Sequence, residues 1–217
     1  MKKLVTFVGI IFIIFPVNAA KLYVANFSSG NLTHWTEKKF VGRTAYRLQE
    51  SSNWEGGVTF LEAESRNSAS GLFREVLVDL KKTPCINWTW KVDSVFQKAD
   101  ETKKSGDDFA ARIYVIFSNN TFLANAEAIN YVWAGRVPKG TTWDSPYSEH
   151  FKMIAIRSGM EDTGRWIFET RDVQQDYFLA TGKTTIEANG VAIMTDSDNS
   201  GGIARAGYGD IYFSDKC

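Results

Sequence analysis

Histidine is scarce in this sequence, which contains only His34 and His150. A zinc site built from several histidines is therefore excluded. The chain also lacks a G-x-S-x-G nucleophile elbow, a G-x-G-x-x-G dinucleotide fingerprint and a P-loop, so nucleotide cofactors and the common hydrolase triads have no support. His150 lies next to Glu149 and near Tyr147, where it offers a lone general base. An isolated histidine beside a strand is more often a structural or surface residue.

Cysteine and net charge are limited as well. The 25 Lys and Arg residues balance the 25 Asp and Glu residues. No overall basic field attracts nucleic acid, so no nucleic-acid partner is expected. The two cysteines are Cys85 and Cys217. In an oxidising compartment they are expected to form a disulfide that ties the last residue to the middle of the chain. The alternative is two unrelated thiols.

Only one long apolar run is present, from Leu4 to Val17, and it follows two lysines. The run is shorter than the roughly 20 residues that span a bilayer, and small residues follow it at Ala19 and Ala20. This pattern predicts a cleaved secretory signal over residues 1–19 and a single domain over 20–217. The mature protein is then expected in the periplasm or outside the cell, with no transmembrane segment. The alternative is an uncleaved N-terminal anchor.

Short apolar segments and turn residues alternate along the rest of the chain. In CINWTWKVD, Ile86, Trp88 and Trp90 alternate with polar residues, which is typical of a strand with one buried face. FAARIYVIFS is expected to be a strand buried on both faces apart from Arg112. Further strands are expected at AYRLQES, GVTFLEAES, LFREVLVDL, INYVWAG, FKMIAIRSG, RWIFET, GVAIMTD and GDIYFSD.

Only TRDVQQDYFLATG has helical spacing, with Val173 and Tyr177 four residues apart and Gly182 at its end. Many short strands and one minor helix predict an all-β fold. The expected architecture is a two-sheet antiparallel β-sandwich, jelly-roll-like, with one short helix.

Carboxylates supply the remaining catalytic chemistry. Asp107 and Asp108 precede the strand that carries Arg112, and Asp196 and Asp198 follow a strand end. A third group contains Arg171, Asp172 and Asp176. Two such acids could flank a glycosidic bond, with Asp108, Asp172 and Asp176 as weak catalytic candidates. The favoured alternative is that the acids and arginines pair with one another at the rim of the sandwich.

The segment AIMTDSDNSGG, residues 192–202, resembles half of a calcium loop. Alternating acidic side chains on a tight glycine turn can supply the oxygen ligands that Ca²⁺ prefers. An EF-hand is excluded, because Gly207 stands where its bidentate glutamate is required. A different calcium site formed by Asp196, Asp198 and Asp210 is one interpretation. A polar hairpin turn is the other, because Asp, Asn, Ser and Gly also form turns.

The loop RVPKGTTWDSPYSEH carries two aromatic residues, Trp143 and Tyr147. Exposed rings stack on the apolar faces of sugars, and a pocket with apolar walls and few polar groups is typical of a ligand site. Trp143 and Tyr147 are therefore candidate ligand-binding residues, with Arg112 and Arg171 as polar partners. The alternative is that Trp143 folds inward and holds the loop.

Four segments occur in a recognisable order: DDFAARIYVIF, INYVWAG, RSGMEDTGRWIFETRDVQQDY and GVAIMTDSDNSGG…YGDIYF. Together they resemble a family of exported bacterial proteins known as domain of unknown function 3047. The resemblance spans roughly Phe27 to Phe213, and Asp172 and Ser197 stand where the family usually has Asn and Thr. It implies the family's fold and export, but no particular activity.

More distantly, NFSSGNLTHW and YGDIYFSD resemble the jelly-roll domains of carbohydrate-binding modules. That resemblance implies a structural calcium near the first turn and the last strand, with Asp210 close to Asn26–Gly30. The combined expectation is a monomeric, non-catalytic protein that binds a glycan or another polar envelope ligand. Two alternatives stay open: a carbohydrate-active hydrolase or lyase that uses paired carboxylates, and a structural envelope protein that binds another protein.

Overall fold

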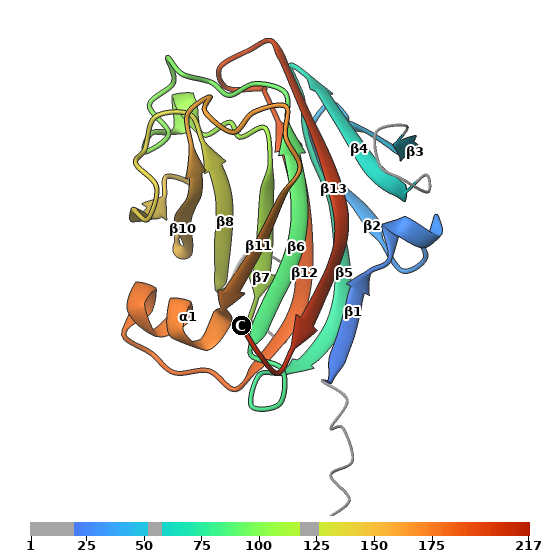
Figure 1. The fold of residues 1–217 in the computed structure, drawn as a ribbon. Coiled ribbons are helices and arrows are strands. Elements are labelled where there is room, and N and C mark those ends of the chain that lie inside the picture. Colours follow the sequence, from blue (N-terminus) through green and yellow to red (C-terminus); the bar gives the residue numbers. More distant parts are fainter. Residues whose placement is uncertain (1–19, 52–57, 118–125) are drawn as a thin grey trace, which may run out of the picture.

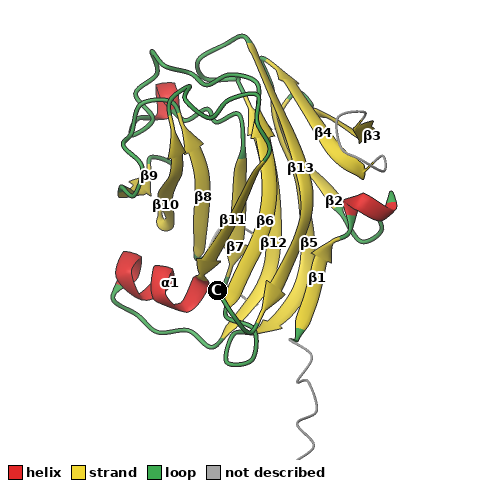
Figure 2. Ribbon diagram, viewed as in Figure 1, coloured by secondary structure: helices red, strands yellow, loops and turns green. Residues whose placement is uncertain are grey.

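Two β-sheets pack face to face in the computed structural model, which describes residues 20–51, 58–117 and 126–217. Figure 1 shows the two layers and the helix α1 (Val173–Thr181) at one end of them. Figure 2 shows how strands dominate the described chain. The predicted all-β sandwich with one short helix is confirmed.

The six-stranded sheet has the order β11-β6-β13-β4-β3, and β1 pairs with β13 outside this path. Every pairing in it is antiparallel. Its strands are β1 (Lys21–Ala25), β3 (Ala45–Ser51), β4 (Val58–Arg66), β6 (Cys85–Val92), β11 (Ile167–Asp172) and β13 (Ile203–Ser214).

The seven-stranded sheet has the order β2-β5-β12-β7-β8-β10-β9. Its strands are β2 (Thr36–Val41), β5 (Ala69–Asp79), β7 (Arg112–Ile116), β8 (Ala128–Ala134), β9 (Thr142–Ser145), β10 (Ser148–Ser158) and β12 (Glu187–Asp196). Two 3₁₀ turns, η1 (Phe27–Ser29) and η2 (Lys104–Gly106), lie in the connections.

One pairing departs from the predicted antiparallel arrangement, because β8 and β10 run parallel. A parallel pair needs a crossover connection, and residues 135–147, which include β9, provide it. Every residue of β8 is buried, as expected for a strand covered on both faces. The sheet is therefore mixed rather than wholly antiparallel.

The core between the sheets is rich in aromatic rings. The ring of Trp88 stacks on Tyr131 of the opposite sheet with centroids 5.3 Å apart, and Trp90 packs on Trp133 at 5.7 Å. All four side chains are almost fully buried. The alternation in β6 therefore buries the predicted face.

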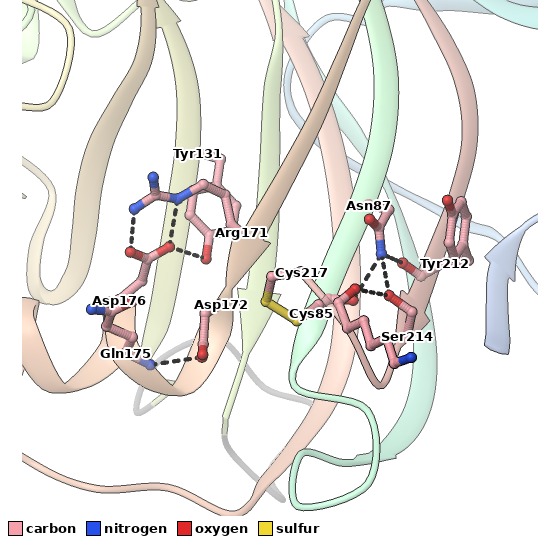
Figure 3. The surroundings of a disulfide bond; sticks show 11 residues. Cys85, Asn87, Tyr131, Arg171, Asp172, Gln175, Asp176, Tyr212, Ser214 and Cys217 are labelled. Atoms are coloured by element: carbon pink, nitrogen blue, oxygen red, sulfur yellow. Dashed lines mark hydrogen bonds and ion pairs between the residues drawn. A yellow bond between two sulfur atoms is a disulfide. The ribbon is translucent and has the colours of Figure 1, made fainter. Parts of the chain in front are cut away.

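Helix α1 and the C-terminus are fixed by specific contacts near one end of the sandwich (Figure 3). Asp172 caps the helix by accepting a hydrogen bond from the Gln175 amide at 3.0 Å, and Gly182 ends it with a φ of 72°. Cys85 and Cys217 form a disulfide with their Cα atoms 5.2 Å apart. The predicted helix and the predicted bond are both present.

The predicted signal segment, residues 1–19, lies outside the described residues. Within the described ranges, no helix is long and apolar enough to cross a membrane.

Candidate functional site

A group of carboxylates gathers where β12 ends and β7 begins. The two strands are antiparallel neighbours, with Met194 opposite Arg112, so residues just before β7 meet residues just after β12. Asp108, Asp196 and Asp198 each place one carboxylate oxygen within 4.8 Å of the other two. We refer to these three residues, with Asp107, as the carboxylate cluster.

Arg112 is the positive partner of the carboxylate cluster. Its Nε donates to Asp196 Oδ1 at 3.1 Å, and its Nη2 donates to the Asp107 carbonyl at 2.8 Å and to the Asp196 carboxylate. Its Nη1 donates to Asp107 Oδ2 at 3.3 Å, and the side chain is buried with both partners. Arg112 is therefore an internal ion-pair residue, which corrects its assignment as a polar partner for a ligand.

Negative charge exceeds positive charge among these side chains, since four acids face one arginine. Burial and the charges of Asp107 and Asp108 outweigh Arg112 and raise the pKa of Asp196 to about 7. Burial, with the nearby charge of Asp108, also raises the pKa of Asp198. The Oδ1 atoms of Asp107 and Asp198 are buried without a hydrogen-bond donor in the described part of the chain. Several carboxylate oxygens close together, with too little positive charge to balance them, fit a divalent cation such as Ca²⁺.

The loop after β12 is bound to the same cluster. Asp108 accepts hydrogen bonds from the Asn199 amide at 3.2 Å and from the Ser200 amide. The Tyr147 hydroxyl donates to Asn199 Oδ1 at 2.8 Å, and the Lys104 ammonium lies 5.4 Å from the centre of the Tyr147 ring. Tyr147 remains mostly exposed, but its hydroxyl is engaged in holding this loop.

Trp143 folds inward rather than forming a stacking surface. It packs on Phe109 with ring centroids 6.4 Å apart, within a cluster that covers part of the outer face of the seven-stranded sheet. Its indole nitrogen is buried. The apolar residues on β8 and β10 draw the partly buried ring onto the sheet, which favours the alternative that Trp143 holds the loop. Its role as a ligand platform stays a prediction.

The predicted residues around α1 form a separate ion pair. Asp176 accepts from Arg171 Nε at 2.9 Å and from the Tyr131 hydroxyl at 2.9 Å, as Figure 3 shows. Asp172 is the helix cap. This group precedes the start of β12, whereas the carboxylate cluster lies at its end. Arg171 is therefore not placed beside Trp143 and Tyr147, and Asp172 and Asp176 have structural partners.

Asp210 also lies away from Asp196 and Asp198. Its Oδ1 accepts from the Ser28 amide at 2.8 Å and its Oδ2 from the Ser28 hydroxyl at 2.6 Å. The expected closeness of Asp210 to Asn26–Gly30 is confirmed. Its predicted place in one metal site with Asp196 and Asp198 is wrong, because β13 carries it to the outer face of the other sheet.

An open cavity with a volume of about 1150 Å³ lies over the outer face of the seven-stranded sheet. Strand alternation produces its floor, since Tyr114 and Ile116 of β7 point outward while Ile113 and Val115 point into the core. Residues that contribute to the lining include Glu37, Lys38, Phe73, Arg74, Glu75, Tyr114, Phe151, Asn189, Ala192 and Met194. We refer to this feature as the sheet groove.

Two contacts shape the floor of the sheet groove. A Cβ at Gly190 would lie 2.8 Å from Phe73 Cε2, so the glycine leaves room for that ring. The Tyr114 hydroxyl donates to Met194 Sδ at 3.6 Å. Sequence reasoning missed this site, although the outward positions of LFREVLVDL, namely Phe73, Glu75 and Leu77, carried a period-two signal for it.

In the described residues, fold and site together define a β-sandwich with one short helix. It has a groove lined by aromatic rings on one sheet and a carboxylate cluster where two strands of that sheet begin and end. Residues 33–212 match the family described as "Protein of unknown function (DUF3047)", and the chain belongs to that family. No curated protein matches it.

Solved structures with a similar fold have distant sequences. A family 11 carbohydrate-binding module of Clostridium thermocellum is 7% identical, with 90% of this chain and 95% of that chain covered and a TM-score of 0.47. The K1 adhesin domain of Lys-gingipain from Porphyromonas gingivalis W83 is 11% identical, with 91% and 99% covered and a TM-score of 0.48. The tailspike protein 4 domain of bacteriophage CBA120 is 11% identical, with a TM-score of 0.46; 87% of this chain but only 20% of that one is covered.

Proposed function

We propose that this protein binds a glycan in the sheet groove without transforming it. The observation that carries the proposal is an open cavity of about 1150 Å³ with the rings of Phe73, Tyr114 and Phe151 in its lining. Ligand sites are commonly concave and apolar, with a few polar groups that fix orientation. Sugars match such a surface, because their C–H faces pack on rings while their hydroxyls bond to the rim.

The charges around the groove favour an uncharged ligand. Glu75 and Lys38 of the lining carry opposite charges, whereas Glu37 is paired with Arg43 at 3.0 Å and the Arg74 guanidinium donates to the Val24 carbonyl. Asn189 adds an amide to it. A strongly anionic or cationic ligand would meet like charge on this rim, whereas a neutral polyhydroxylated chain can exchange hydrogen bonds with both kinds of group.

Binding is tested with a glycan array followed by calorimetry on the best ligand. Phe73→Ala and Phe151→Ala are each expected to weaken binding about tenfold, since stacking contacts of this kind contribute about 1 kcal/mol or more. Phe178→Ala serves as the control, because Phe178 is an exposed ring on α1 and is not among the described residues that line the groove. Absence of any glycan ligand, or equal affinity in all three variants, would refute the proposal.

A hydrolase or lyase function gains no specific support from this arrangement. The carboxylate cluster is absent from the described lining of the sheet groove. Asp196 is held by Arg112, and Asp172 and Asp176 by structural partners. Binding without catalysis is therefore the function that the geometry favours.

We further propose that the carboxylate cluster holds a structural Ca²⁺ through Asp108, Asp196 and Asp198. The support is the convergence of these oxygens and the buried Oδ1 of Asp198, which lacks a hydrogen-bond donor in the described residues. A cation that binds only the folded state raises stability by mass action. The melting temperature of chelated protein should thus rise with added Ca²⁺, and Asp198→Asn should reduce that rise.

Asp210→Asn is the control for the calcium proposal, since Asp210 bonds to Ser28 and lies outside the cluster. It should respond to Ca²⁺ as the unmodified protein does. An identical melting temperature with chelator and with Ca²⁺ would leave the segment after β12 as a turn only.

Export is proposed from the N-terminal sequence and the disulfide. Disulfides persist mainly in oxidising compartments, and Cys85–Cys217 forms one here. N-terminal sequencing of protein from the periplasm and the medium should give a first residue near Ala20. A chain that begins at Met1 and remains with the membranes would instead indicate an anchor.

A further inference from the structure

A second, smaller cavity lies on the outer face of the six-stranded sheet, the sheet opposite to the one that carries the groove. Its volume is about 170 Å³, and Phe60, Trp166, Phe168 and Asp210 contribute to its lining. From this geometry we propose that the pocket binds a quaternary ammonium group, as found in choline. The proposal is independent of glycan binding, because it concerns another ligand class and the other sheet.

Glycines on β13 let the aromatic side chains of the pocket pack directly on its backbone. A Cβ at Gly207 would lie 2.7 Å from the Trp166 ring and 3.2 Å from Phe60, and a Cβ at Gly209 would lie 2.0 Å from Thr89 Oγ1. The absence of these Cβ atoms lets the side chains of neighbouring strands close over the backbone of β13. The backbone of β13 therefore lies beneath the pocket, and the side chains of the neighbouring strands form its walls.

The aromatic walls meet at a corner rather than forming a flat platform. The ring planes of Phe60 and Trp166 are inclined at 77°, with centroids 5.1 Å apart. Phe168 is mostly exposed and pairs in register with Thr89, which also contributes to the lining. A corner of about 170 Å³ is smaller than the roughly 300–1000 Å³ of common ligand sites. It suits a compact, rounded group better than the flat face of a sugar ring.

Charge selects a cation for this pocket. Asp210 is the only ionisable acid or base among the described lining residues, apart from the Tyr212 phenol. Ser28 fixes its carboxylate through two hydrogen bonds, of 2.8 and 2.6 Å. The Tyr212 ring contacts a cation of the protein itself, because the Lys21 ammonium lies 4.8 Å from the centre of that ring. Phe60, Trp166 and Phe168 then supply the aromatic surface, and aromatic faces beside a carboxylate are the usual receptor for quaternary ammonium groups.

Choline and its neutral analogue 3,3-dimethylbutan-1-ol test the proposal, because they share a shape and differ in charge. Choline should bind the full protein about tenfold more tightly than the alcohol in an NMR titration, a difference within the range of cation–π and charge effects. Phe168→Ala and Asp210→Asn should each weaken choline binding, while Phe178→Ala should not. Equal binding of choline and the alcohol, or no binding of either, would overturn the proposal.

Two further arms identify the source of the group and separate this site from the groove. Sedimentation with phosphatidylcholine vesicles, but not with phosphatidylglycerol vesicles, would assign the ligand to a lipid headgroup. Choline binding without vesicle binding would assign it to a soluble or polymer-borne group. Phe73→Ala, which tests the groove, should leave choline affinity unchanged; a loss there would contradict a separate pocket.

Discussion

Arg112 shows at the scale of one residue how a buried charge depends on its partners. Its guanidinium is held by Asp107 and Asp196, and all three side chains are buried. Its position in an apolar strand marked it as unusual in the sequence. The sequence pattern alone did not reveal that one partner, Asp107, precedes β7 and that the other, Asp196, ends β12.

Removing this guanidinium should be costly. Arg112→Leu leaves the acids of the cluster without their counter-charge, so the free energy of unfolding should fall by about 3–5 kcal/mol. Arg112→Lys retains the positive charge but not the planar guanidinium that bonds to two groups at once, so its free energy of unfolding should fall by less than that of Arg112→Leu. Urea denaturation measures both variants. A leucine variant as stable as the unmodified protein would mean that the acids are already neutral without Arg112.

Trp143 offers a residue-scale test of inward packing. Trp143→Ala removes the contact with Phe109, and because the ring is only partly buried we expect a loss of about 2 kcal/mol. Glycan affinity should stay within about twofold of the unmodified protein, a change of less than about 0.5 kcal/mol, because Trp143 is not among the described lining residues of the sheet groove. Thermal unfolding and calorimetry give the two values. Lost glycan binding at unchanged stability would instead restore Trp143 as a ligand platform.

At the scale of elements, strands with one buried face were predictable and exposed strands were not. Trp88 and Trp90 alternate with polar residues, and β6 forms at that segment. In contrast, β2 reads TEKKFV and is mostly exposed, so its hydrophobic pattern is weak. Strand β9 is also short and mostly polar. Both strands lie at edges of the seven-stranded sheet, where packing constrains only part of the sequence.

The sequence pointed to the acidic residues of the carboxylate cluster, but it did not show which of them lie together. Asp196 and Asp198 were expected to lie together, and Asp108 joined them because β7 pairs with β12. The sheet groove depends on strand order, which places β5, β12 and β7 side by side. Pairing between strands distant in sequence has no local signal, so neither the groove nor the parallel β8–β10 pair could be anticipated.

Gly190 on β12 tests how one element shapes the floor of its neighbour. Gly190→Ala would place a Cβ against the Phe73 ring, so the ring must move. We expect a loss of about 1–3 kcal/mol in stability and weaker glycan binding. Phe73→Leu is the matched background, because the smaller side chain should reduce the stability cost of the added methyl group. If Gly190→Ala lowers the free energy of unfolding equally with Phe73 in place and in the Phe73→Leu background, contact with the Phe73 ring is not the cause of the loss.

The whole molecule is held together by a bond between its middle and its end. The disulfide joins residues separated by 132 positions, from the start of β6 to the C-terminal residue. In the chain-entropy account, closing so long a loop stabilises the folded state by up to about 5 kcal/mol. Replacing both cysteines by serine should lower the denaturation midpoint accordingly. An unchanged midpoint would show that the unfolded chain gains little freedom when the bond is absent.

Two cavities on different sheets give the whole molecule two separate surfaces for ligands. The sheet groove is large and its charges are balanced, whereas the pocket over β13 is small and acidic. With the aromatic core between them, a substitution on one face should leave the other face intact. The two proposals thus assign the glycan to one sheet and the quaternary ammonium group to the other.

Strand β13 is the last strand of the chain, yet it lies inside its sheet between β6 and β4 and also pairs with β1. Lys21 stands opposite Ser214 in that pairing. Contacts between such distant residues form late, because a long loop must close first. Strand β13 joins β4 to β6 and is the strand partner of β1 in the described residues. A chain cut short before Ile203 should therefore lose the pairing that joins the two halves of this sheet, and we expect no cooperative unfolding transition from it.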